Sequence, residues 1–132
     1  MGKGSDRGKI KKARKVKNLE HQAQVAVFTW AAMAKAEFPE LRRLFAIPNG
    51  GARNIVTAKN LKAEGVKPGI PDLMLAVARH GKHGLFIEMK IKPNKLSALQ
   101  EAEILALNDA GYLAVVCWSS HEAIDVLQKY LS

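Results

Sequence analysis

The chain has a single cysteine, Cys117, which has no partner within the 132 residues for a disulfide. No apolar run approaches the roughly 20 residues that a membrane-spanning helix needs, and the basic N-terminus is not followed by the apolar core of a signal peptide. Internal repeats are also absent. These absences predict one globular domain that works in a reducing, cytoplasmic setting.

Acidic residues are in short supply, with 12 Asp and Glu against 21 Lys and Arg, and the net charge is +9. Residues 1–19 hold eight basic side chains and only Asp6 as an acidic one, so they carry +7 of that charge. A basic segment of this kind is typical of a chain that binds a polyanion, because neutralised phosphates release their counterions. The alternative is a solvated tail that keeps the protein soluble. We expect a basic, flexible arm over residues 1–18 and a folded domain over residues 19–132.

Hydrophobic periodicity and turn signals predict the order α-β-α-β-β-α-β-α, which is an α/β fold with a mixed central sheet flanked by helices. The first helix is expected to start at Leu19, capped by Asn18. Ser97 and Gln100 have the spacing of a capping box at the start of a later helix, and Ser120 is expected to cap the last one. Strands are expected over residues 44–47, 73–77, 85–91 and 113–118, and the two other helices over residues 54–64 and 97–111.

Two acidic side chains and a lysine are expected in one β-hairpin. Asp72 follows Pro71 and precedes an apolar strand, while Glu88 and Lys90 share one face of the next strand because side chains alternate. A turn centred near His80 would place Asp72 opposite Glu88, with Cβ atoms about 5 Å apart. Two carboxylates at that separation repel each other unless a proton or a cation lies between them. The pattern is that of a metal-dependent nuclease, in which Mg²⁺ is held by oxygen donors beside a lysine.

Each of these residues also has a simpler interpretation. Glu88 and Lys90 could form an ordinary ion pair on an exposed strand face, and Asp72 could be a turn residue. Glu20 is favoured in the first turn of a helix by the helix dipole, whatever its function. Two histidines in the hairpin turn, His80 and His83, make an incomplete zinc site and are better explained by the turn itself.

The motifs taken together resemble the VRR-NUC family, the virus-type replication-repair nucleases of the PD-(D/E)xK superfamily. The resemblance runs from about Leu19 to Leu131. The segments that carry it are Ile47-Pro48-Asn49-Gly50-Gly51-x-Arg53, Leu61-Lys62-x-Glu64-Gly65-Val66-x-x-Gly69-Ile70-Pro71-Asp72-Leu73, His83-Gly84-Leu85-Phe86-Ile87-Glu88-Met89-Lys90, Leu96-Ser97-x-x-Gln100 and Gly111-Tyr112.

This resemblance implies a restriction-endonuclease-like fold and phosphodiester hydrolysis that depends on Mg²⁺ or Mn²⁺. It implies that Asp72, Glu88, Glu20 and the backbone carbonyl of Met89 bind metal. Lys90 corresponds to the catalytic lysine, and Gln100 corresponds to a supporting glutamine on the following helix. Basic and polar residues outside this set are expected to contact nucleic acid, namely Asn49, Arg53, Lys62 and Lys67 ahead of the site, and Lys11, Lys12 and Arg14 in the arm.

Small members of the family from phage and bacteria form homodimers that act on branched DNA such as Holliday junctions. The resemblance therefore implies a structure-selective, homodimeric endonuclease in a bacterial or phage-infected cell. Two alternatives remain at this point. One is a less selective nicking or flap nuclease of replication or repair, and the other is a nucleic-acid-binding module without catalysis.

Overall fold

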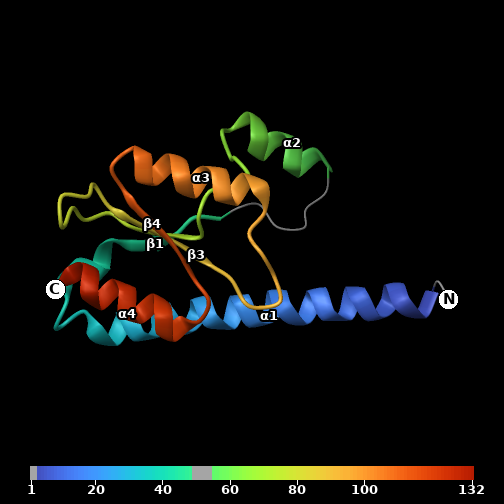
Figure 1. Cartoon of the computed structure of the whole chain (residues 1–132), viewed down its shortest axis with the longest axis horizontal. Coiled ribbons are helices and arrows are strands. Elements are labelled where there is room, and N and C mark those ends of the chain that lie inside the picture. Colours follow the sequence, from blue (N-terminus) through green and yellow to red (C-terminus); the bar gives the residue numbers. More distant parts are fainter. Residues whose placement is uncertain (1–2, 49–54) are drawn as a thin grey trace.

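The computed structural model describes residues 3–48 and 55–132. Within them the elements follow the predicted order (Figure 1). Their bounds are α1 (Lys3–Ala34), a 3-10 helix η1 (Pro39–Arg43), β1 (Leu44–Ala46), α2 (Ile55–Ala63), β2 (Leu73–Leu75), β3 (Leu85–Met89), α3 (Ala98–Asp109), β4 (Leu113–Cys117) and α4 (Ser120–Leu131). None of the helices in this part of the chain combines the length and the apolar character required to cross a membrane.

The four strands form one mixed sheet in the order β1-β2-β3-β4. Neighbours β1 and β2, and β2 and β3, are antiparallel, whereas β3 and β4 are parallel. Helices α1 and α4 pack against each other on one face of the sheet, and α3 lies on the other (Figure 1). The predicted α/β fold with a mixed, helix-flanked sheet is confirmed.

The main core lies between the sheet and the layer of α1 and α4. It takes Val27 from α1, Ile87 and Met89 from β3, and Leu127 from α4. The odd-numbered side chains of β3 therefore point into this core, and the even-numbered Glu88 points to the face covered by α3. The predicted alternation along this strand is correct.

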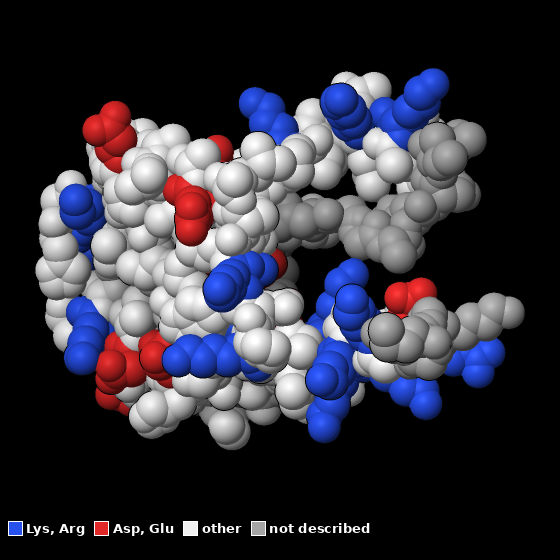
Figure 2. Space-filling model, turned by 45° about the vertical axis from the view of Figure 1, so that its right-hand side comes forward, with Lys and Arg blue, Asp and Glu red and all other residues white. Residues whose placement is uncertain are grey.

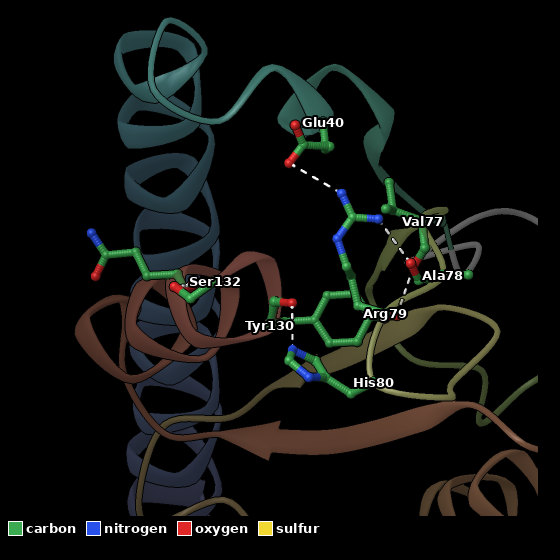
Figure 3. Close-up of polar contacts among 8 residues, drawn as sticks. Glu40, Val77, Ala78, Arg79, His80, Tyr130 and Ser132 are labelled. Atoms are coloured by element: carbon green, nitrogen blue, oxygen red, sulfur yellow. Dashed lines mark hydrogen bonds and ion pairs between the residues drawn. The ribbon is translucent and has the colours of Figure 1, made fainter.

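The tip of the β2–β3 hairpin is a two-residue turn. His80 and Gly81 have φ values of 53° and 73° between Arg79 and Lys82, whose backbone groups bond to each other. Turns with two positive φ values match the twist of antiparallel strands. The segment is attached to α4, because a ring nitrogen of His80 lies 2.9 Å from the Tyr130 carbonyl oxygen and the Tyr130 hydroxyl donates to the Val77 carbonyl (Figure 3). His80 therefore has a structural role in the turn.

Two helix starts differ from the prediction. Helix α1 begins at Lys3 and continues through Asn18, where a cap had been expected. Eight of the sixteen residues from Lys3 to Asn18 are Lys or Arg, which favour helix, and no proline interrupts them. Val16, near the end of the basic segment, is buried, so tertiary packing also supports this part of α1. Helix α4 is capped by the side chain of Ser119, which accepts from the Glu122 N–H at 3.0 Å, and Ser120 is the first helical residue.

Candidate active site

Asp72 and Glu88 face each other at the end of the β2–β3 ladder. The register pairs Leu73 with Ile87 and Leu75 with Leu85, and its continuation places Asp72 opposite Glu88, as the sequence predicted. Asp72 is fixed from both sides. Its Oδ2 accepts from the Met89 N–H at 2.8 Å, and its backbone carbonyl accepts from the Ile47 N–H at 2.7 Å. The sheet therefore holds this carboxylate in place through two neighbouring strands.

Glu88 carries an ionisable carboxyl group, yet the residue is only 3% exposed. Its Oε1 accepts from Gln100 Nε2 at 3.0 Å, but Oε2 is buried and receives no hydrogen bond from the described residues. Lys90 makes no close ion pair with Glu88 in this part of the chain. The interpretation of Glu88 and Lys90 as an ion pair on an exposed strand is therefore wrong. A buried carboxylate oxygen without a donor is costly, so it calls for a proton or a cation.

The electrostatics of the two carboxyls agree with that conclusion. Burial and, after it, the charge of Asp72 raise the pKa of Glu88 to about 8, although Lys90 acts in the opposite direction. Burial also raises the pKa of Asp72, while the hydrogen bond from Met89 lowers it. When Glu88 is protonated it has a hydrogen that it can donate to Asp72. Without a cation, the pair thus retains a proton near neutral pH.

Gln100 reaches the site from the first turn of α3. Its Oε1 accepts from the Ser97 N–H at 2.9 Å, and Ser97 Oγ accepts from the Gln100 N–H at 3.1 Å, so the predicted capping box is present. The same side chain donates through Nε2 to Glu88. Gln100 therefore links the cap of α3 to the acidic pair.

Glu20 approaches the acidic pair from α1, which lies on the face of the sheet opposite α3. Its Oε1 accepts from Asn94 Nδ2 at 3.1 Å, and its charge contributes to the raised pKa values of Asp72 and Glu88. Even so, the described residues contain no group of three His, Cys, Asp or Glu side chains close enough to hold a metal ion by themselves. Asn94 was not predicted from the sequence, because nothing local connects it to a residue 74 positions earlier.

A groove of about 1130 Å³ opens at this site. Glu20, Asp72 and Met89 are among the residues that line it, with others from α1 and the end of β1. The groove thus brings together three of the four residues for which metal binding was predicted, and it adds Lys17, His21 and Gln24 from α1.

The residues expected to contact nucleic acid are more dispersed. Lys11, Lys12 and Arg14 are exposed on α1, while Lys62 and Lys67 are exposed at and beyond the end of α2. Asn49 and Arg53 lie outside the described residues. Lys90 follows β3 directly, its N–H donating to the Cys117 carbonyl at 2.9 Å, and its charge lowers the pKa of both acidic residues.

Comparisons with known proteins agree with this site. The family model of the VRR-NUC domain matches residues 10–121. A solved structure named VRR_NUC domain protein is similar over 86% of this chain and 88% of its own, with a TM-score of 0.73 and 31% sequence identity. A comparison with curated proteins found no match. The chain belongs to the VRR-NUC domain family, whose members are nucleases of the PD-(D/E)xK type that act on DNA.

Proposed function

We propose that the protein is a metal-dependent endodeoxyribonuclease that hydrolyses phosphodiester bonds with Mg²⁺ or Mn²⁺. The observation that carries the proposal is the facing pair of Asp72 and Glu88, with one buried oxygen of Glu88 left without a donor. Such an arrangement is unfavourable in a protein that binds nothing there, because both carboxyls resist ionisation.

The donor set fits a hard divalent cation. Mg²⁺ in phosphoryl-transfer sites usually takes one or two carboxylates from the protein, and water and substrate oxygens complete its coordination. Asp72 and Glu88 would supply those two carboxylates, with the Met89 carbonyl and Glu20 as further oxygen donors. When bound, the cation supplies a water of lowered pKa and a Lewis acid for the scissile phosphate.

The other residues act on the reacting groups. Lys90 would orient the attacking water, accept its proton and offset negative charge that develops on the phosphate. Gln100 keeps the Glu88 carboxylate oriented through its Nε2. Lys17 in the groove, with Lys62 and Lys67 near α2, would hold the phosphate backbone.

We further propose that the protein works as a homodimer on four-way junctions. A two-fold dimer presents two equivalent sites, which matches paired cuts in a symmetric junction. Large apolar side chains outside the groove are exposed on β1 and α3 and available for a second copy, namely Phe45, Leu99 and Leu105. The proposed location is the cytoplasm of a bacterial or phage-infected cell.

Cleavage assays on a matched set of DNAs test the proposal. A four-way junction, a flap, a plain duplex and a single strand should be compared with Mg²⁺, Mn²⁺ or EDTA, using the wild type and Asp72→Ala. We expect paired, symmetric cuts in the junction that disappear in EDTA and in the variant, while DNA binding by the variant persists. Sedimentation velocity should give twice the mass of one chain.

Each other outcome is informative. Metal-dependent cutting of flaps or duplex in place of junctions would favour the less selective nicking or flap nuclease. Cleavage that survives in Asp72→Ala would contradict the assigned metal site. Binding without cleavage of any DNA would favour the non-catalytic binding module.

A further inference from the structure

The N-terminal half of α1 forms a straight basic helix that extends past the sheet. Helix α1 is continuous over its 32 residues, and its N-terminus lies at one extreme of the molecule (Figure 1). The part that precedes Glu20 is roughly 25 Å long at about 1.5 Å per residue. Its basic side chains are exposed, namely Arg7, Lys9, Lys11, Lys12, Arg14, Lys15 and Lys17.

The basic part of α1 leads into the candidate active site. Figure 2 shows its Lys and Arg side chains along one side of a hollow in the molecule. Lys17 and Glu20, at the end of the basic part, line the same groove as Asp72. A polyanion that lies along this part of α1 would therefore reach the acidic pair.

We propose that the basic part of α1 lies along the backbone of a double-helical arm of the substrate, on one side of the scissile phosphate. At about 3.4 Å per base pair, the helix would follow the arm for roughly seven base pairs. The proposal rests on the nuclease function above and adds that the bound arm needs a minimum length of duplex. A flexible arm over the same residues would impose no defined length.

The composition of this part of α1 favours duplex over single-stranded DNA. Single strands are bound without sequence preference largely by aromatic side chains on which bases stack. The sequence from Lys3 to Val27 contains no Phe, Tyr or Trp. Contacts along it would thus be made to phosphates. A helix with fixed charge spacing is suited to a stiff phosphate backbone and less to a coiling strand.

Helical periodicity divides the basic residues into two groups. At about 100° per residue, the residues of α1 that line the groove are centred near the direction of His21. Four basic residues lie within roughly 80° of that direction, namely Arg7, Lys11, Arg14 and Lys17. Lys9, Lys12 and Lys15 lie roughly 120° or more from it. Asp6 also faces the groove side and reduces its net charge. We therefore assign the phosphate contacts along the arm to the first four residues, and expect Lys12 to contribute less than the sequence alone indicated.

The first experiment measures binding of duplexes of increasing length by fluorescence anisotropy in EDTA, where binding is separated from cleavage. For the wild type, affinity should rise with length to a plateau near seven base pairs on one side of the site. Ala13→Pro keeps every charge but breaks the helix, and should lose on the order of tenfold in affinity for long duplexes. Gly8→Ala is the control, because a Cβ there meets nothing within 4 Å and a helix gains from the change, so its affinity should be equal or higher.

The second experiment removes the same charge from the two faces of the helix. The Lys11, Arg14 and Lys17 triple alanine variant should lower the slope of log affinity against log salt by roughly three. The Lys9, Lys12 and Lys15 triple alanine variant should lower it by clearly less. Equal losses in the two triples, wild-type binding by Ala13→Pro, or equal affinity for single strands of the same length would each overturn the inference.

The two proposals can fail separately. If the wild type cuts DNA with Mg²⁺ but shows no dependence on duplex length, the nuclease function stands and the inference about α1 is wrong. If the wild type cuts no DNA but binding still rises to the length plateau, the nuclease proposal fails and the duplex-binding role of α1 remains.

Discussion

Gln100 donates to Glu88 through Nε2 at 3.0 Å while its Oε1 accepts from the N–H of Ser97 at 2.9 Å. One amide thus completes the cap of α3 and orients a candidate metal ligand. The two roles can be separated, because a glutamate at the same position also completes a capping box but cannot donate.

Gln100→Glu should keep the cap and lose activity. It replaces the donor to Glu88 by another carboxylate, so we expect metal affinity or the cleavage rate to fall by about 10- to 100-fold. Gln100→Ala should lose the same activity and also about 1 kcal/mol of stability, because the Ser97 N–H loses its acceptor. Urea unfolding and single-turnover cleavage measure the two effects. Normal cleavage by Gln100→Glu would show that the Nε2 contact is not needed.

Asn94→Ala should weaken metal binding by roughly tenfold, because Glu20 would lose the donor that orients it. Isothermal titration with Mn²⁺ measures this. Asn108→Ala is the matched control, since that amide bonds to the backbone of Ile104 and Ala114 far from the acidic pair. The control should lose about 2 kcal/mol of stability and keep its metal affinity. Equal metal affinities in wild type and Asn94→Ala would contradict the role of Asn94.

Gly69→Ala should be more destabilising than Gly65→Ala. Both glycines have positive φ, of 88° and 97°, so both substitutions introduce backbone strain of about 1 kcal/mol. Only at Gly69 would the new Cβ lie 2.8 Å from a backbone oxygen, that of Leu99 in α3. We expect an additional loss of about 2 kcal/mol for Gly69→Ala. Chemical denaturation of the two variants tests this, and equal losses would show that the loop and α3 can separate freely.

The stability of the metal-free protein should fall as the pH rises. Folding raises the pKa of Asp72 above its ordinary value of 3.8. It raises the pKa of Glu88 from 4.5 to about 8. A carboxyl with a raised pKa stabilises the fold fully below its unfolded pKa, and this contribution is lost as the pH rises through the folded value. The melting temperature in EDTA should therefore decrease between pH 5 and about pH 8.5. Adding Mg²⁺ should raise the melting temperature more at about pH 8.5 than at pH 5. Glu88→Gln should flatten this dependence, and an unchanged slope would argue against Glu88 as its origin.

Much of the fold could be predicted because its signals are local. The glycines mark the hairpin turn, and counting residues about a turn centred near His80 gives the observed register and the facing of Asp72 and Glu88. The Ser97 and Gln100 spacing likewise gave the capping box. The start of α1 was predicted wrongly, since lysine-rich sequence is compatible with both helix and flexible chain, and the burial of Val16 depends on tertiary contacts.

The site could be predicted only in part for the same reason. Asp72 and Glu88 lie on neighbouring strands, where a short-range pattern reveals them. The contact between Glu20 and Asn94 joins segments distant in the sequence, so only the three-dimensional arrangement shows it. The roles of Lys90 and Gln100 came from the family resemblance, and the structure adds the dual hydrogen bonding of Gln100.

The hairpin register also constrains how this chain can vary in evolution. Side chains alternate between the two faces of a strand, so inserting or deleting one residue between Leu73 and Ile87 would turn one carboxylate away from the other. A change of length in the segment between α3 and β4, or at the C-terminal end of α4, would leave that pairing intact. Homologous sequences should therefore differ in length at many places but conserve the spacing between their two acidic residues, unless a compensating bulge restores the register.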